Sequence, residues 1–256
     1  MWRLLHTCAV TWLLDLDGVV WLADQPIPGS ADAIARLRAR GERVVLASNN
    51  SFLTIADYLA KLERHGVPTD AADLVTAAHA AGTLIEPGER ILVVGGPGVR
   101  EAVRARGAEE IPDTETHADA VVVAWNQAFD YAMLTRAMRA VRAGARLIAT
   151  NGDATYPTPD GLLPGGGSIM AAVAYASGVD AVVAGKPYQP MVDTITARFG
   201  AIEVMVGDRA DTDGLLARRL GATFALVLTG VTRPEDLPID PSPDRVADSL
   251  ADLVGP

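Results

Sequence analysis

The chain has 256 residues, of which 49% are hydrophobic, so it can bury a substantial core in one large domain or two modest ones. Its formal net charge of −10 argues against non-specific nucleic-acid binding and against adhesion to anionic membranes, since both need basic surfaces. The single cysteine, Cys8, excludes an intrachain disulfide and a multi-cysteine metal site, and no apolar run is long enough to span a bilayer. We therefore expect a cytoplasmic protein with no nucleic-acid or membrane partner.

The first predicted element is a buried parallel strand over residues 9–14, which runs directly into Asp15 and Asp17. We interpret residues 1–14 as leading into this strand rather than as a signal peptide, because they end in an acidic pair and not in a small-residue cleavage site. Side chains two residues apart on a strand point to the same side, so both carboxylates can address one small volume. Such a pair implies a cation or a shared proton; the alternative is a simple turn after the strand.

Alternating strands and helices follow, which is the pattern of a parallel sheet with right-handed crossovers. The further predicted strands span residues 43–47, 91–94, 120–124, 146–149, 181–184 and 203–206, with a last strand ending near residue 230. The predicted helices span residues 30–40, 98–106, 131–142 and 168–177, with others ending near residue 65 and flanking the strand at 203. Residues 150–167 are predicted to form a long loop, and a proline-rich tail precedes a short helix near residues 245–253.

Polar side chains follow four of the predicted strands. The four clusters are Asp15 with Asp17, Ser48 with Asn49 and Asn50, Lys186, and Asp208 with Asp213. Because the strand ends of one parallel sheet meet at one edge, where open α/β sheets bind ligands, we expect the clusters to converge. Together they supply a nucleophile, further carboxylates, hydroxyl and amide donors and a cation, which are the parts needed to transfer a phosphoryl group.

Each cluster has a physical role in such a transfer. A phosphate ester repels a carboxylate nucleophile, and Mg²⁺, which prefers oxygen ligands, can bridge Asp15, Asp208 and a phosphate oxygen. Lys186 can hold a second phosphate oxygen and keep Asp15 ionised. Ser48 and the backbone N–H after it can donate to a third oxygen. A protonated Asp17 can serve the leaving group and then act as a base for water, so hydrolysis proceeds through an aspartyl-phosphate.

The four motifs resemble the signature motifs of the haloacid dehalogenase superfamily. They read Leu-Asp-Leu-Asp-Gly-Val, Ser48-Asn49-Asn50, Gly185-Lys186-Pro187 and Gly207-Asp208-Arg209-x-x-Thr212-Asp213. Their order and spacing are similar to those of its NagD-like branch (subfamily IIA), which includes glycerol-phosphate, phosphoglycolate, nucleotide and p-nitrophenyl phosphatases. The resemblance covers nearly the whole chain. It implies an α/β fold with a Rossmann-like parallel-sheet core, residues 1–77 and 166–256, and an inserted α/β cap, residues 78–165.

The resemblance also implies roles for individual residues. Asp15 is expected to be the nucleophile, Asp17 the general acid and base, and Lys186 the group that balances charge. The phosphate is expected to contact Ser48, Asn49, Asn50 and Lys186. The expected Mg²⁺ ligands are Asp15, the backbone carbonyl of Asp17, Asp208 and, through water, Asp213. The role of Asp211 stays open, with a helix N-cap as the alternative.

In the implied cap, two stretches at residues 150–153 and 158–164 are the expected source of substrate contacts, with Asn151 and Asp153 as candidates. The alternative is that they form a structural turn at the base of the cap. Residues 165–167, three glycines, are expected to be the hinge on which the cap returns to the core. The resemblance further implies a homodimer formed through the cap.

Two other functions stay open from the sequence. A dehalogenase would need the nucleophilic Asp15 but no metal, and the crowding of Asp17, Asp208 and Asp213 disfavours it, because uncompensated carboxylates are costly to bring together. A non-catalytic protein that closes its cap on a phosphorylated metabolite is disfavoured because all four motifs are intact. The sequence therefore predicts a Mg²⁺-dependent phosphatase for a small phosphomonoester, and it does not identify which one.

Overall fold

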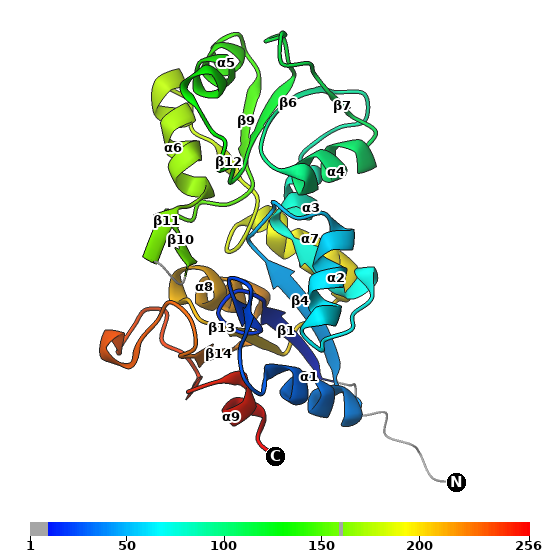
Figure 1. Ribbon diagram of the computed structural model, residues 1–256, viewed down its shortest axis with the longest axis vertical. Coiled ribbons are helices and arrows are strands. Elements are labelled where there is room, and N and C mark those ends of the chain that lie inside the picture. Colours follow the sequence, from blue (N-terminus) through cyan, green and yellow to red (C-terminus); the bar gives the residue numbers. More distant parts are fainter. Residues whose placement is uncertain (1–9, 159–160) are drawn as a thin grey trace.

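In the computed structural model, which describes residues 10–158 and 161–256, two α/β units lie one above the other (Figure 1). The lower unit is built on a six-stranded sheet and the upper unit on a five-stranded sheet. The predicted α/β class with a parallel-sheet core is confirmed. Ala9, the first residue of the predicted first strand, the single cysteine Cys8, and residues 159–160 of the predicted cap stretch lie outside the described residues.

The larger sheet is entirely parallel. Its order is β15 (Arg245–Ala247), β14 (Thr223–Val227), β13 (Val204–Gly207), β1 (Thr11–Asp15), β4 (Arg43–Ser48) and β5 (Leu74–Thr76). Side chains alternate between its faces, so Trp12 and Leu14 pack on one side and Leu13 on the other. The first face is covered by α1 (Ser30–Ala39), α2 (Ile55–Arg64) and α9 (Leu250–Val254). The second is covered by α3 (Ala77–Gly82), α7 (Gln189–Phe199) and α8 (Leu215–Leu220).

The smaller sheet is also parallel. Its order is β12 (Val182–Val183), β9 (Arg146–Ala149), β8 (Ala120–Val123), β6 (Arg90–Val94) and β7 (Glu109–Glu110). Helices α5 (Tyr131–Arg142) and α6 (Gly166–Ser177) pack on one face. On the other face, α4 (Pro97–Ala105) and α3 join a hydrophobic cluster that continues to the larger sheet. The two units therefore share one continuous apolar core.

Local signals in the sequence set where several helices begin. The side chain of Thr54 accepts the backbone N–H of Asp57, and the Asp57 carboxylate accepts the N–H of Thr54, which forms a capping box at the start of α2. Asp130 caps α5 by accepting the N–H of Met133 at 2.7 Å. Pro97 occupies the first turn of α4, where its missing N–H costs no hydrogen bond.

Short elements complete the chain and correct two predictions. They are the ribbon of β2 (Trp21–Leu22) with β3 (Gln25–Pro26), the hairpin of β10 (Thr155–Thr158) with β11 (Gly161–Pro164), 3₁₀ turns at Ala71–Asp73 and Pro234–Asp236, and a π-helical turn at Ala210–Gly214. The prediction of a long loop over residues 150–167 is wrong, because the paired strands β10 and β11 lie within it. Its prolines hid the strand pattern, but an isolated two-stranded ribbon tolerates them. The predicted helix near residues 245–253 is wrong at its start, because residues 245–247 pair with β14 as an edge strand.

The smaller unit extends further along the chain than predicted. The sequence-based division returns the chain to the core at residue 166, yet α6 packs against α5 and the smaller sheet, and β12 pairs with β9. The domain limits stay a prediction, and this packing favours a return to the larger unit only after Val183.

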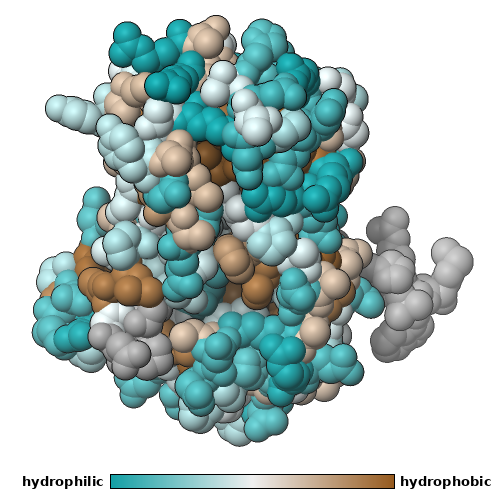
Figure 2. Space-filling view, turned by 45° about the horizontal axis from the view of Figure 1, so that its top comes forward, coloured by the Kyte–Doolittle hydropathy of each residue, from teal (hydrophilic) through white to brown (hydrophobic). Residues whose placement is uncertain are grey.

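Most of the surface in view is hydrophilic, with small apolar patches that lie mainly near the narrowing between the units (Figure 2). Among the residues that the structure describes, no helix combines the length and apolar character needed to cross a membrane.

The glycines at residues 165–167 are needed for close packing. A Cβ at Gly165 would lie 2.3 Å from the carbonyl oxygen of Asp153, and one at Gly167 would lie 2.3 Å from the carbonyl oxygen of Gly152. The start of α6 is thus pressed against the backbone that leaves β9. This contact gives a physical reason for the three glycines that does not depend on the predicted hinge, which stays a prediction.

We predict that Gly167→Ala lowers the free energy of unfolding by about 1–3 kcal/mol, because a backbone oxygen would have to move to admit the methyl group. Gly82→Ala in α3 is the matched control: its new Cβ would meet only ordinary contacts at 3.6 Å or more, and alanine favours a helix by about 0.5–1 kcal/mol over glycine. Urea unfolding of both variants measures the difference. A Gly167→Ala protein as stable as the unsubstituted chain would contradict the packing argument.

Candidate active site

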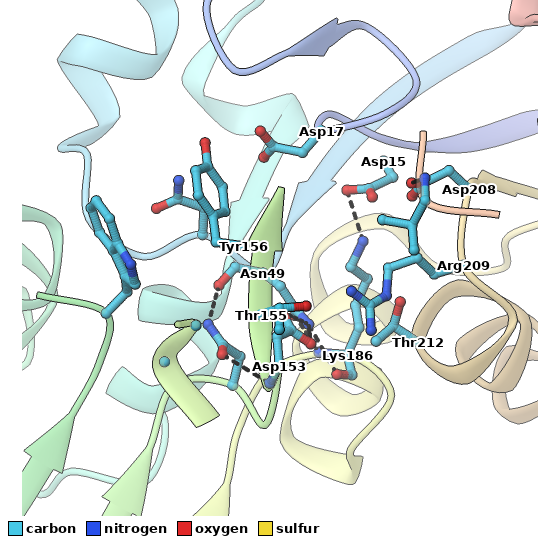
Figure 3. Close-up of a pocket in the computed structure, with 16 residues that line it drawn as sticks. Asp15, Asp17, Asn49, Asp153, Thr155, Tyr156, Lys186, Asp208, Arg209 and Thr212 are labelled. Carbon is cyan, nitrogen blue, oxygen red and sulfur yellow. Dashed lines mark hydrogen bonds and ion pairs between the residues drawn. The ribbon is translucent and has the colours of Figure 1, made fainter. Parts of the chain in front are cut away.

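Three of the four predicted clusters leave neighbouring strands of the larger sheet. Asp15 ends β1, Ser48 ends β4 and Asp208 follows β13, and these strands are adjacent. Lys186 does not come from this sheet, because the strand before it, β12, belongs to the smaller sheet. The expectation that all four clusters leave one sheet is therefore wrong for Lys186, although its side chain still reaches the others (Figure 3).

The Lys186 ammonium lies between two carboxylates. Its Nζ is 2.8 Å from Oδ1 of Asp15 and 2.7 Å from Oδ1 of Asp213, and all three side chains are buried. Burial alone would lower the pKa of Lys186, but the two carboxylates raise it above its usual value, so the amine stays charged. Burial raises the pKa of Asp15 well above its usual value, and Lys186 opposes that rise. The backbone N–H of Leu16 also donates to Oδ1 of Asp15 at 2.8 Å, so both contacts engage the same oxygen.

Asp208 has a buried oxygen without a partner. Its Oδ2 accepts the N–H of Val231 at 2.6 Å, whereas Oδ1 is buried and makes no hydrogen bond within the part of the chain that the structure describes. Two glycines make room for this carboxylate: a Cβ at Gly230 would lie 1.9 Å from Oδ2, and one at Gly18, whose φ is +88°, would lie 2.5 Å from Cγ. Burial, reinforced by Asp213, raises the pKa of Asp208 to about 7. The Asp208 carboxylate is therefore fixed through Oδ2, and its Oδ1 is left to bind a ligand from outside the described chain.

These carboxylates fit a divalent cation. Asp15, Asp208 and Asp213 each place a carboxylate oxygen within 4.8 Å of the others. The donors are all hard oxygens, which Mg²⁺ prefers, and the orphaned Oδ1 of Asp208 is among them. Asp213 is the least free of the three, since its Oδ1 binds Lys186 and its Oδ2 accepts the N–H of Arg209 at 3.2 Å. Its predicted role at the metal stays a prediction.

Asp17 lines the same pocket from the loop after β1, and it is partly exposed. The indole N–H of the buried Trp21 donates to its Oδ1 at 3.1 Å. Behind the indole, the Lys61 ammonium lies 4.3 Å from the ring centroid and donates to the carbonyl of Ala23. Burial raises the pKa of Asp17, and Lys61 and Trp21 oppose this rise. A raised pKa suits a carboxyl group that must carry a proton before it gives it up.

The loop after β4 is ordered by its own side chains. Ser48 is fully buried; its Oγ accepts the N–H of Asn50 at 3.1 Å and lies 3.3 Å from the hydroxyl oxygen of Tyr58. Tyr58 donates to the carbonyl of Asn50 at 2.7 Å. The Asn50 side chain accepts the N–H of Phe52 at 2.9 Å. These bonds give the predicted phosphate-binding loop a single shape, and Asn49 and Asn50 line the pocket.

Three predicted substrate contacts bind one another. The side-chain amide of Asn151 donates to the backbone carbonyl of Asn49 at 2.8 Å, and its oxygen accepts the N–H of Asp153 at 3.2 Å. The side-chain amide of Asn49 donates to Asp153 at 3.1 Å. Asn49, Asn151 and Asp153 also line the pocket, so contact with substrate stays a prediction. Burial raises the pKa of Asp153, which Arg209 opposes.

The pocket encloses about 630 Å³, open solvent at its mouth included, and some of its walls were missed from the sequence. Trp125 and Tyr156 face it from the smaller unit, with ring centroids 5.7 Å apart, and Phe52 packs edge-on against Trp125. Trp125 lies just after the end of the strand β8, as Asp208 lies after β13. This position at the end of a parallel strand is the feature of the sequence that could have predicted Trp125 as a pocket residue. Tyr156 carried no such signal, because its hairpin was not predicted.

Arg209 also lines the pocket, and its guanidinium pairs with Asp211 at 2.9 Å. The Asp211 side chain is not the N-cap of the π-helical turn, whose N-cap position is Arg209. Burial raises the pKa of Asp211, but the hydrogen bond and charge of Arg209 lower it below its usual value overall. Asp211 therefore holds the guanidinium of Arg209 at the edge of the pocket.

Comparison with known proteins gives consistent matches. A family model described as haloacid dehalogenase-like hydrolase matches residues 12–109, and one described as HAD-hydrolase-like matches residues 183–253. D-glycerol 3-phosphate phosphatase of Mycobacterium tuberculosis is 37% identical over 90% of this chain and 65% of its own length. Chronophin of Rattus norvegicus is 35% identical over 94% of this chain and 86% of its own length. The crystal structure of the M. tuberculosis glycerol phosphate phosphatase in complex with magnesium has a TM-score of 0.86 and 34% identity, covering 94% of this chain and 75% of that chain.

The fold and the site together define an enzyme with a parallel-sheet α/β core, whose site suits a phosphate ester and a divalent cation. The matches define it more closely: the chain belongs to the haloacid dehalogenase-like hydrolase family, in its NagD-like branch of phosphatases. The predicted resemblance, the phosphatase class and Mg²⁺ as the cofactor are thereby confirmed. The roles of individual residues stay predictions.

The pKa of Asp208 near 7 predicts that protons compete with Mg²⁺. In the metal-free protein, Asp208 is protonated at acidic pH. The free energy of unfolding falls as pH rises from the pKa that Asp208 has in the unfolded chain to about 7, its pKa in the folded chain. Mg²⁺ binding requires the ionised form of Asp208. Displacement of the Asp208 proton alone lowers the apparent Mg²⁺ affinity about tenfold for each pH unit below 7, and any proton displaced from Asp15 adds to this. Thermal unfolding against Mg²⁺ concentration at acidic and at alkaline pH measures this. Equal affinities on both sides of pH 7 would contradict it, and Asp208→Asn is the control that should lose the Mg²⁺-dependent shift.

Proposed function

We propose that this phosphatase hydrolyses a small phosphomonoester through an aspartyl-phosphate on Asp15. The observation that supports this most directly is the buried Lys186 ammonium beside Asp15, together with the unpartnered Oδ1 of Asp208. One pocket thus holds a carboxylate nucleophile, Asp15, a fixed ammonium, Lys186, and a carboxylate oxygen of Asp208 that is free to bind a metal ion. These groups meet the requirements of phosphoryl transfer.

The residues divide the work. The second oxygen of Asp15, outside the two contacts to Oδ1, attacks phosphorus, and the bond to the ester oxygen breaks. Asp17, whose raised pKa favours the protonated form, gives its proton to the departing oxygen and then takes one from the water that attacks the aspartyl-phosphate. Lys186 fixes Asp15 and offers positive charge to the phosphate. Mg²⁺, held by Asp15 and Asp208, would supply further neutralisation of the phosphate charge.

The substrate class is proposed as a small phosphorylated metabolite: a sugar phosphate, glycerol phosphate, phosphoglycolate or a nucleoside monophosphate. Two of the matches named above, the D-glycerol 3-phosphate phosphatase and the glycerol phosphate phosphatase structure of M. tuberculosis, act by their names on glycerol phosphate. Trp125 and Tyr156 line the end of the pocket contributed by the smaller unit, where the leaving group would lie. A panel of these phosphomonoesters with Mg²⁺, ranked by kcat/KM, tests the proposal, and no phosphate release from any of them would overturn it.

The two other functions have less support. Dehalogenation would leave the buried Asp208 oxygen without a ligand, which is costly. A non-catalytic binding protein would not need a nucleophile held by a buried lysine. Ligand-induced thermal stabilisation without phosphate release would favour that function.

A homodimer through the smaller unit and a cytoplasmic location also belong to this proposal. Tyr175 on α6 and Val182 on the edge strand β12 are exposed apolar side chains of that unit, which such an interface would cover.

Asp15→Asn is expected to lower kcat at least about 1,000-fold, because the amide cannot form the acyl-phosphate bond that the mechanism needs. The substitution preserves shape, so the circular dichroism spectrum and a cooperative thermal transition should be retained. Asp193→Asn, on the exposed side of α7, is the matched control and should keep kcat within about twofold. Turnover near the unsubstituted rate in Asp15→Asn would rule out this nucleophile.

Removal of divalent metal with a chelator is expected to abolish phosphate release, and added Mg²⁺ should restore it, because Asp15 and Asp208 otherwise repel the phosphate dianion. The measurement is initial rate with p-nitrophenyl phosphate before and after dialysis. Undiminished activity in the chelator would instead support the metal-independent dehalogenase chemistry.

A further inference from the structure

The chain reaches Lys186 from the smaller sheet. The backbone N–H of Gly185 still donates to the carbonyl of Thr150, at 2.7 Å, which continues the pairing of β12 with β9. The next N–H, that of Lys186, leaves this ladder and donates to Oδ1 of Asn49 at 2.7 Å. The side chain of Asn49, from the larger unit, thus replaces the strand β9 as the hydrogen-bond partner of the backbone at Lys186.

Asn49 binds Lys186 at two points. Besides accepting the Lys186 N–H, it donates from Nδ2 to the Lys186 carbonyl at 3.1 Å, and Nδ2 also donates to Asp153. These partners fix which end of the amide is oxygen, because only Nδ2 can donate to a carbonyl and a carboxylate. Gly185 lets the two groups approach, since a Cβ there would lie 2.6 Å from Oδ1 of Asn49. Both polar atoms of the amide are occupied, and the residue is buried.

We propose that Asn49 is a positioning residue for Lys186 rather than a ligand of the phosphate. Its amide holds the backbone of residue 186 at both its N–H and its carbonyl, so that the long lysine side chain starts from a fixed point. Nζ then reaches Asp15 and Asp213 at 2.8 and 2.7 Å. The inference deepens the proposed function and rests on it only for the kinetic arm of its test.

The sequence offers a sharp structural readout, because the chain contains only two lysines, Lys61 and Lys186. Lysine labelled with ¹⁵N at both nitrogens therefore gives two backbone amide signals and two side-chain ammonium signals. Lys61 lies in α2 with its ammonium bound to the Ala23 carbonyl, so it is an internal reference that Asn49 does not touch.

In Asn49→Ala, exchange of the Lys186 amide with solvent deuterium is expected to accelerate at least about tenfold, while that of Lys61 stays within about twofold. The Lys186 ammonium signal should shift or broaden, because the backbone of Lys186 is no longer held by Asn49. Asn49→Asp keeps an oxygen for the Lys186 N–H but replaces Nδ2, the donor to the Lys186 carbonyl and to Asp153, so it should retain only part of the amide protection that Asn49→Ala loses. Asn126→Ala, in the smaller unit, is the matched control and should leave both lysines unchanged. An unchanged Lys186 amide in a folded Asn49→Ala protein would overturn the proposal.

The kinetic arm is a double-mutant cycle with p-nitrophenyl phosphate as substrate. Asn49→Ala alone is expected to lower kcat about 10- to 100-fold with little change in KM, since displacement of a catalytic group by about an ångström has this effect. In a Lys186→Met background the same change should cost less than about threefold, because the group that Asn49 positions is gone. Losses that simply multiply would show that Asn49 acts independently, as a phosphate ligand would, and would overturn the proposal.

The two arms separate the possible failures. If the unsubstituted protein releases no phosphate with Mg²⁺, the proposed function fails, and the exchange of the Lys186 amide still decides whether Asn49 holds it. If Lys186→Met does not fold, the comparison of Asn49→Ala with Asn49→Asp by exchange decides in the same way.

Discussion

The buried ion pairs of Lys186 are the interaction on which the site depends. One ammonium serves Asp15 and Asp213, and the carboxylate of Asp208 lies within reach of the same space. Three carboxylates and one ammonium leave a formal charge of −2 when all are ionised, since −3 and +1 sum to −2. A buried excess of this size is unstable in a medium of low dielectric, and a protein relieves it by binding a proton or a cation. Burial, reinforced by the charge of Asp213, raises the pKa of Asp208, and a divalent cation would cancel the excess charge in full.

The same constraint explains the local backbone around the site. Carboxylates can be crowded only where neighbouring Cβ atoms are absent, and Gly18, Gly207 and Gly230 each border Asp208 or Asp213 at distances that exclude a side chain. Gly18 also takes a positive φ, which turns the chain away as soon as Asp17 has been placed. The motifs therefore combine groups that react with glycines that make room for them, and both are required by one cluster of charge.

The sequence was informative where a single strand decides the position of a residue. Asp15, Ser48 and Asp208 each follow an apolar run, and the parallel order of β1, β4 and β13 brings them together without further information. Lys186 was placed correctly at the site but on the wrong sheet, because strand pairing between units is not encoded in local periodicity. Tyr156 was missed because prolines disguised the β10–β11 hairpin, and the pairing of Asn49 with Lys186 was missed because it joins residues 137 positions apart.

The position of Lys186 also connects the two units chemically. Its backbone is held on one side by the ladder of the smaller sheet and on the other by Asn49 of the larger unit, whose amide in turn binds Asp153. Asp153 follows β9 and lines the pocket beside Thr155 and Tyr156, where a leaving group would lie. Asp153, which lines the pocket, and the Lys186 ammonium beside Asp15 thus belong to one hydrogen-bond network. Under the proposed function, a change in the walls of the smaller unit would reach Asp15 through Asn49 and Lys186, which would link selection of the substrate to the rate of its hydrolysis.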